Sequence, residues 1–319
     1  MAAGSADPYQ SKLPAQVRVI VRDWLNSNSV LILGSRETAL IDSGYSACAG
    51  ETLRLLQRPE ALGARRLDRL VNTHCHSDHV GGNAVLRGAY RCRVSIPQGE
   101  APLVARWDSR ALWLDYADQY CDPFLYDEVI APSERLILGD LEWEAIPVPG
   151  HDMGALAFYC EEARLLVSGD ALWERGFGVI APESGEPVRL KAARQALETL
   201  ARLDVETVIP GHGLPFGNME AALERAFKRL EAFQADPTRT ARHFLKAMLM
   251  FALLEKRRMA LAALPTYLEA VDAYQEVNRR FLGLSPAGLA EWLVAELERM
   301  GALTRRGGFI YPAAAGARG

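Results

Sequence analysis

The sequence predicts a layered α/β (α+β) domain that is followed by a mostly helical C-terminal domain. Three observations support this fold class. Short β-branched runs alternate with helical patterns between residues 17 and 209, and from residue 220 onward the pattern is helical almost throughout. The net charge changes at the same place, because residues 1–219 carry −8 and residues 220–319 carry +4. We therefore expect two domains, residues 1–218 and 219–319.

The first domain is expected to begin with three short strands between residues 17 and 42, because turn residues such as Gly34-Ser35-Arg36 separate its apolar runs. A helix from Gly50 to Leu56 and a buried strand from Leu67 to Thr73 follow. The alternation then continues along the chain. We expect a helix at 83–87, strands at 92–96, 142–148, 155–160 and 165–168, a helix at 188–202 and a strand at 207–209.

The C-terminal domain is expected to end differently from its helical beginning. Helical patterns cover 221–234, 240–258, 264–281 with interruptions, and 286–300. Pro286 stands in the first turn of the last helix, where its missing N–H costs nothing. The segment Leu303–Tyr311 then has the pattern of a β-hairpin. A helix followed by a hairpin predicts a winged-helix-like ending.

Composition indicates an ordinary globular protein, with 49 % hydrophobic and 24 % charged residues. A net charge of −4 gives no overall attraction to nucleic acid or to an anionic membrane. The segment Met1–Gln10 lacks the pattern of a secretory signal, and no apolar stretch is long enough for a membrane span, so a cytoplasmic location is expected. The five cysteines are scattered and form no CxxC pair, which favours reduced thiols.

Histidine is rare but concentrated, because five of the six histidines lie in short motifs rich in Gly, Ser, Thr or Asp. The densest motif, HxHxDH, comprises His74, His76, Asp78 and His79 and directly follows a predicted buried strand. Burying four such polar groups without partners costs roughly several kcal/mol. A purely structural role therefore does not explain this motif. Alternation along an extended segment lets His74 and His76 converge on one ion, while the turn presents the other two to a second.

Three further candidates also follow predicted strands. His151 stands in a Pro-Gly-His segment, Asp170 follows the apolar run Leu165–Gly169, and His212 follows the strand at 207–209 and a glycine. Functional loops gather at such strand ends. The sequence therefore predicts one site at an edge of the sheet, to which all seven residues contribute.

In this order and in these contexts, the seven residues resemble the metallo-β-lactamase superfamily, and in particular its glyoxalase II-like (hydroxyacylglutathione hydrolase-like) branch. The resemblance covers about residues 15–218 and implies an αββα sandwich with the site on one edge. Asp42, in Ile41-Asp42-Ser43-Gly44, matches the first short motif of the superfamily and would orient a histidine or the HxHxDH loop. The implied ligand sets are His74, His76 and His151 for one metal and Asp78, His79 and His212 for the other, with Asp170 as the bridge.

Two positions at which this sequence differs from other branches of the superfamily limit the activities that the resemblance implies. The members that hydrolyse β-lactams typically differ where this chain has Asp170, and flavodiiron-type members have a glutamate where this chain has Ser77. Both activities are therefore disfavoured. The ending 285–312 is similar to the winged-helix extension of lactamase-β-like proteins, some of which are endoribonucleases and some polyketide thioesterases.

The resemblance implies two divalent metal ions per chain and a hydrolytic reaction. Two ions about 3.5–4 Å apart share a bridging hydroxide, which attacks a carbonyl that the ions polarise. Asp78 would orient this nucleophile or accept its proton. Imidazole and carboxylate ligands suit zinc best and are compatible with iron and manganese.

The expected substrate is a small molecule with a fairly apolar acyl group. Aromatic residues at 107–126, and especially Trp173 and Phe177 after Asp170, are candidates for the acyl pocket, although packing against the sheet explains those at 107–126 equally well. A thiolate leaves without a proton, so we expect hydrolysis of a thioester or ester, including lactones. The ending does not match the C-terminal domain of glutathione-specific esterases, which disfavours glutathione.

Two alternative functions stay open. A metal-dependent endoribonuclease is the first, because Lys256-Arg257-Arg258, Arg279-Arg280 and Arg305-Arg306 are basic, although a solvated surface explains them better. The second is an oxidoreductase like the persulfide dioxygenases, which keep these ligands and bind a single iron.

The helical C-terminal domain would form a wall of the substrate pocket or the interface of a homodimer.

Overall fold

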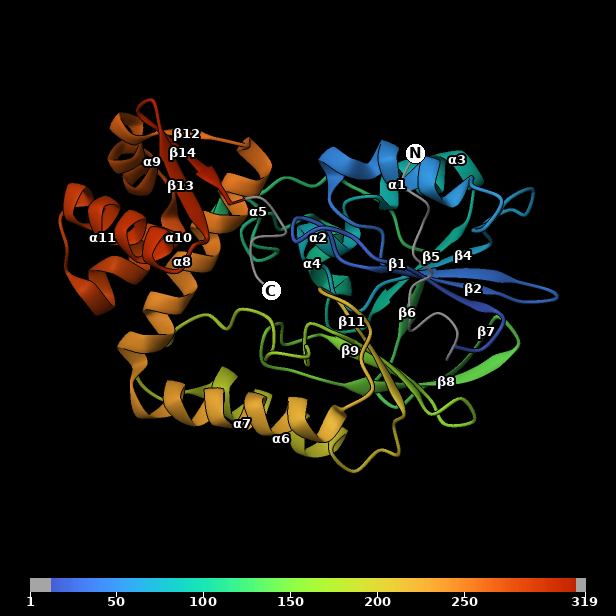
Figure 1. Ribbon diagram of the computed structural model, residues 1–319. Helices are drawn as coiled ribbons and strands as arrows, with labels where there is room; N and C mark the ends of the chain where they lie inside the picture. Colours follow the sequence, from blue (N-terminus) through green and yellow to red (C-terminus); the bar gives the residue numbers. More distant parts are fainter. Residues whose placement is uncertain (1–12, 314–319) are drawn as a thin grey trace.

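Strands from the first part of the chain form a six-stranded sheet in sequence order from β1 to β6. The computed structural model describes residues 13–313 (Figure 1). The strands β1 to β3 pair antiparallel, whereas β3 to β6 pair parallel. The strands are β1 (Val17–Ile20), β2 (Ser29–Leu33), β3 (Thr38–Ile41), β4 (Arg69–Val71), β5 (Arg93–Pro97) and β6 (Glu128–Ile130).

A second sheet has five strands in the order β11-β10-β9-β8-β7. Neighbouring strands are antiparallel except for β10 and β11, which are parallel. The strands are β7 (Arg135–Leu138), β8 (Leu141–Pro147), β9 (Leu156–Cys160), β10 (Leu165–Gly169) and β11 (Thr207–Pro210).

Side-chain alternation explains why the two sheets face each other. On β2, Val30 and Ile32 point into a core shared with Trp143 and Phe158 of the second sheet, whereas Leu31 points to the opposite face. Such period-two alternation puts successive residues on opposite faces of a strand. Both faces of the first sheet are therefore covered.

Helices cover the two outer faces. The helices α1 (Ala49–Leu56), α3 (Asn83–Tyr90) and α4 (Ala101–Arg106) pack on the first sheet, and α6 (Val188–Leu200) and α7 (Met219–Ala235) pack on the second. In the view of Figure 1, α1 and α3 lie above the sheets, and α6 and α7 lie below them. The predicted αββα sandwich is confirmed.

The C-terminal region is helical, as predicted, and ends in a hairpin. Asp236 accepts from the N–H of Thr238 and caps α8, whose first residue is a proline, and Ser285 caps α11 by accepting from Gly288. The two-residue strand β12 was not predicted and extends the hairpin to the sheet β12-β14-β13. The elements are α8 (Pro237–Lys256), β12 (Met259–Ala260), α9 (Leu264–Ala270), α10 (Asp272–Val277), a π-helical segment (Asn278–Leu282), α11 (Pro286–Arg299), β13 (Leu303–Arg306) and β14 (Phe309–Pro312).

Packing relates this region to the sandwich in two ways. Leu230 and Phe233 of α7 belong to the core beneath the second sheet, although the predicted boundary after residue 218 assigns α7 to the second domain. The core of the later helices also includes Trp113 and Val179 from loops of the sandwich. The domain boundary and the winged-helix interpretation stay predictions.

Two sequence-based expectations concern membranes and export. Within residues 13–313, no helix has the length and apolar character needed to cross a bilayer. The segment Met1–Gln10, from which we expected no secretory signal, lies outside the described residues.

Candidate metal centre

The seven predicted ligands come together at one edge of the sandwich. The HxHxDH residues begin just after β4 and continue into the short helix α2 (Ser77–Val80). His151 lies between β8 and β9, Asp170 directly follows β10, and His212 follows β11. Each segment leaves the carboxyl end of a strand, which explains why residues far apart in sequence meet here.

Ligand atoms of these residues form three groups, in each of which they lie within 4.8 Å of one another. Two groups coincide with the ligand sets that the family resemblance implies, and the third joins Asp170 to a histidine of each set. The groups are His74, His76 and His151; Asp78, His79 and His212; and His74, His79 and Asp170. The arrangement therefore has room for two neighbouring ions with one carboxylate between them.

Unpartnered ring nitrogens fit this interpretation. Among the described residues, His74 Nε2 and His79 Nε2 are buried without a hydrogen-bond partner. His76 Nδ1 and His151 Nε2 face each other at 2.8 Å. A buried polar atom without a partner destabilises the folded state. Converging imidazoles and carboxylates are suitable ligands for a divalent metal ion, which would supply the missing partner. The residues thus fit the divalent metals that this donor set favours.

Hydrogen bonds on the outer side of the rings fix their orientation. His79 Nδ1 donates to Asp42 Oδ2 at 2.8 Å, and the same carboxylate accepts from the N–H and hydroxyl of Thr73 at 2.9 and 2.8 Å. His151 Nδ1 donates to the carbonyl of Val179 at 2.5 Å. These bonds turn Nε2 of both histidines toward the other candidate ligands, as a metal site requires. Asp42 lies where the sequence predicted an orienting residue.

The protonation states also suit cation binding. Burial, with the neighbouring His79 and His76, holds the pKa of His74 well below its usual range, and burial lowers the pKa of His76 to about 4. Burial alone would raise the pKa of Asp170, but His212 and His79 hold it well below its usual range. Neutral His74 and His76 therefore coexist with an ionised Asp170 near pH 7, whereas Asp42 and Asp170 outweigh burial and hold the pKa of His79 well above its usual range.

A pair of acidic residues, buried Glu100 and partly buried Asp152, lies near His76 and was not predicted. Asp152 Oδ2 is 3.6 Å from His76 Nε2, and Asp152 Oδ1 accepts from the N–H of Gly154 at 2.7 Å. Burial of Glu100, which is 4 % exposed, and its contact with Asp152 raise the pKa of Glu100 to about 9. Glu100 therefore carries a proton near pH 7.

Replacing Glu100 with glutamine is expected to flatten the dependence of stability on pH. Between the ordinary pKa of 4.5 and about 9, folded wild-type protein retains a proton that the unfolded chain releases. The contribution of Glu100 to the free energy of unfolding therefore falls as pH rises, by up to about 1.4 kcal/mol per pH unit. Urea denaturation between pH 5 and 9 measures this slope. Glu186→Gln, at an exposed position, should keep the wild-type slope; an unchanged slope in Glu100→Gln contradicts the prediction.

Tryptophans border the site. Trp173 Nε1 donates to Asp170 Oδ1 at 3.1 Å, and its ring centroid is 5.3 Å from that of His212. Trp24, which follows β1, stacks on His212 with ring centroids 5.6 Å apart and planes within 4°. Trp24 is 52 % exposed, so it offers an apolar surface to solvent beside the site. Sequence patterns gave no signal for Trp24, because the chain separates it from His212 by most of the sandwich.

The other predicted pocket residue has a different place. Phe177 is 4 % exposed and lies against Phe233 of α7, with the guanidinium of Arg229 over its ring. It lines a cavity of about 10 Å³ behind His151 and Asp170, which is about the volume that one water needs. Phe177 therefore supports the loop that carries Trp173, and its role as a pocket residue stays a prediction.

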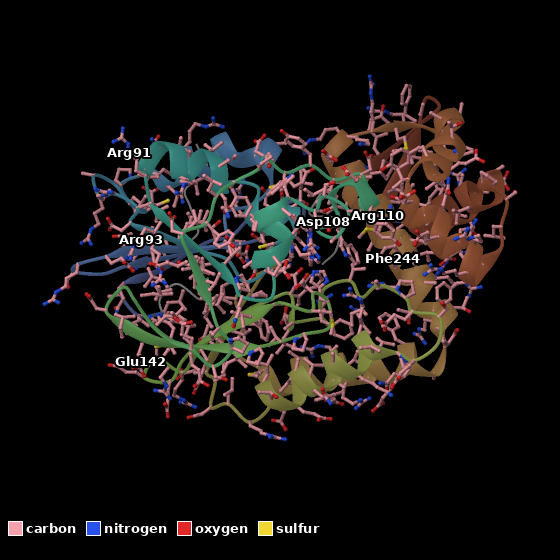
Figure 2. All side chains as sticks on the ribbon, turned by 180° about the vertical axis from the view of Figure 1, so that it is seen from behind. Arg91, Arg93, Asp108, Arg110, Glu142 and Phe244 are labelled. Carbon is pink, nitrogen blue, oxygen red and sulfur yellow. The ribbon has the colours of Figure 1, made fainter. Side chains whose placement is uncertain are left out.

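The aromatic segment at 107–126 divides between the core and the site. Trp107 and Phe124 pack on each other in the core, with centroids 5.7 Å apart. The ring centroid of Trp113 instead lies 5.3 Å from that of His76 and 5.8 Å from that of Phe244 on α8. Figure 2 labels Phe244 where the C-terminal helices meet the sandwich. The C-terminal region therefore packs against a tryptophan ring that borders the candidate site.

Comparison with known proteins agrees with this geometry. A family model described as the metallo-beta-lactamase superfamily matches residues 22–212. A hydroxyacylglutathione hydrolase of Methylococcus capsulatus is 30 % identical over 278 residues, which are 80 % of this chain and 94 % of that protein. The acyl-coenzyme A thioesterase MBLAC2 of Gallus gallus is 27 % identical over 214 residues, covering 60 % of this chain and 74 % of that protein.

Solved structures share the fold over nearly the whole chain. A metallo-beta-lactamase family protein from Thermus thermophilus aligns with a TM-score of 0.58 at 21 % identity, covering 94 % of this chain and 99 % of that one. A beta-lactamase domain protein from Burkholderia ambifaria gives 0.56 at 20 % identity, covering 97 % and 98 %. With a family model that spans more than half of its length, the chain belongs to the metallo-β-lactamase superfamily of metal-dependent hydrolases.

Proposed function

We propose that the chain is a dinuclear-metal hydrolase that cleaves the thioester or ester bond of a small acyl substrate. The observation that carries this proposal is the pair of three-residue ligand groups on either side of Asp170. His74, His76 and His151 would hold one ion; Asp78, His79 and His212 would hold the other. Two such ions supply the Lewis acidity that makes water a nucleophile near neutral pH and polarises a carbonyl.

The protein's own residues would supply position and proton transfer. Asp78 Oδ2 lies 3.1 Å from His212 Nε2 in the second ligand group, where it would orient the attacking water and accept its proton. Asp42 keeps His79 in the tautomer that binds metal. A thiolate needs no proton to leave, so a thioester demands the least from these groups.

An apolar acyl group fits the rim. Trp24 and Trp113 lie against a ligand of each group, and Met153 and Leu214, each two residues beyond a ligand histidine, are 46 % and 56 % exposed. Exposed apolar side chains around a polar centre favour a substrate with an apolar part. The thioester activity named for MBLAC2 in Gallus gallus agrees with this substrate class.

The basic residues of the C-terminal region are partly neutralised, which weighs against RNA as the substrate. Arg305 pairs with Glu298 at 2.7 Å, and Arg280 lies 3.8 Å from Glu276. Counterion release drives nucleic-acid binding and needs free cations, so these pairs reduce the attraction.

Metal stoichiometry and a substrate panel test the proposal together. Elemental analysis of unsupplemented protein should give two divalent metals per chain, with zinc expected. Acyl-CoA, acyl-glutathione, lactone and p-nitrophenyl ester substrates should then include one that is hydrolysed. A single iron per chain contradicts the proposal in favour of oxygen chemistry. Two bound zincs with no turnover of any ester or thioester, or with RNA cleavage instead, reject the substrate class.

A further inference from the structure

The two oxygens of the Asp170 carboxylate have different surroundings. Oδ2 lies 3.5 Å from His151 Nε2 and 3.8 Å from His212 Nε2, so it faces one histidine of each ligand group. Oδ1 lies 3.5 Å from His79 Nε2 and accepts the indole N–H of Trp173 at 3.1 Å. Of the two oxygens, Oδ2 is therefore the one that lies nearest to a histidine of each ligand group, which turns it toward both ions of the proposed centre.

We propose that Trp173 is a positioning residue that selects Oδ2 of Asp170 as the oxygen shared by the two metals. The proposal rests on the proposed dinuclear centre. A neutral N–H donor at one oxygen fixes the plane of the carboxylate, because a partial rotation about the Cβ–Cγ bond would leave a buried oxygen and the indole N–H without partners. Asp170 is 6 % exposed, so water cannot readily replace this bond.

The loop that carries Trp173 is itself held in place. Backbone bonds join Trp173 and Gly176 in both directions, at 2.7 and 3.3 Å, and the N–H of Gly178 donates to the carbonyl of Asp170 at 2.7 Å. A Cβ on Gly176 would approach the Arg229 guanidinium to 2.4 Å, so the turn fits closely against α7. The indole is therefore presented by a closed turn whose far end packs on the sandwich.

Trp24 is the matched comparison. Its ring stacks on His212 and meets Trp173 edge to face at 5.5 Å, but no hydrogen bond from Trp24 to the carboxylate is present among the described contacts. Trp173→Phe removes the N–H donor and keeps an aromatic ring. Trp24→Phe removes an indole from the same cluster and leaves the donor to Asp170 in place.

Zinc titration of the metal-free proteins against a chromophoric chelator tests the proposal without measuring activity. Wild-type protein and Trp24→Phe should bind two zinc ions with the same two dissociation constants. In Trp173→Phe the weaker constant should rise about 10-fold or more, the usual effect of removing a group that orients a metal ligand. Substituting Mn²⁺ should also reduce the magnetic coupling between the two ions in this variant alone, which a general loss of structure does not reproduce selectively.

The outcomes separate two kinds of failure. If wild-type protein binds two zincs and Trp173→Phe binds both as tightly, the role of Trp173 is wrong while the dinuclear centre stands. Equal weakening of both sites, or the same weakening in Trp24→Phe, also overturns the positioning role. If wild-type protein binds fewer than two metals, the proposed function itself is wrong.

Discussion

Alanine in place of Asp78 is expected to remove one of the two metal ions and to lower kcat by about 10²–10⁴-fold, the contribution typical of a proton-transfer group. The side chain belongs to the second ligand group, and its Oδ2 is 3.1 Å from His212 Nε2. Burial alone would raise the pKa of Asp78, but the charge of His79 lowers it, so the side chain is an ionised ligand. The remaining histidines cannot replace this negative charge. Elemental analysis and kcat on the best thioester of the panel measure the two effects.

An exposed carboxylate provides the control for this variant. Asp204 pairs with Arg164 at 2.6 Å on the surface, and its side chain is 74 % exposed. Such surface pairs contribute little to stability. Asp204→Ala should therefore keep two metals and wild-type kcat. Asp78→Ala protein that retains two metals and more than half of the wild-type turnover contradicts the assignment of Asp78.

Gly211→Ala is also expected to lower kcat strongly, although it removes no candidate ligand, because its added methyl group would clash with the site. A Cβ at this position would lie 2.2 Å from Asp170 Oδ1 and 3.0 Å from His79 Cε1. The backbone cannot move away, because Gly211 donates to the carbonyl of Gly169 and accepts from the N–H of Asn28, both at 2.7 Å. Asp170 must therefore shift. A displacement of about 1 Å costs about 10²-fold in rate, and kcat measures it.

The matched control is a glycine with open space around it. Gly88 lies on α3, and a Cβ there would meet nothing within 4 Å. Gly88→Ala should keep wild-type kcat and increase the free energy of unfolding slightly, by up to about 1 kcal/mol, because alanine favours helix. Equal kcat in Gly211→Ala and wild-type protein, with both metals bound, shows that the site tolerates this contact and refutes the prediction.

The candidate ligands could be selected from sequence because each lies in a local pattern. His74, His151 and His212 each follow an apolar strand and stand beside glycine or another ligand type, so short segments were sufficient. The regular periods of the strands and helices predicted a layered α/β domain, and the family resemblance implied its αββα sandwich. Two-residue strands such as β12 carry too little pattern to be recognised.

What sequence could not predict depends on contacts between distant segments. Trp24 reaches His212 across the two sheets, and Glu100 meets Asp152 only because the loops after β5 and β8 converge. Trp173 was predicted as a pocket residue from its nearness to Asp170, but its indole N–H forms a bond that only the turn geometry reveals. Closeness in sequence to the candidate ligands indicated which residues lie near the site. It did not predict what Trp24, Glu100 and Trp173 contact there.

The contact from His76 through Trp113 to Phe244 has a consequence for folding. These three rings form a continuous path from a metal-ligand candidate to the interior of the C-terminal helices. Arg110, which Figure 2 labels and which lies on the same segment as Trp113, pairs with Asp272 and Glu276 of α10 at the surface. Local opening of the last helices would therefore loosen the site, so the two regions share one cooperative unit of native-state fluctuation.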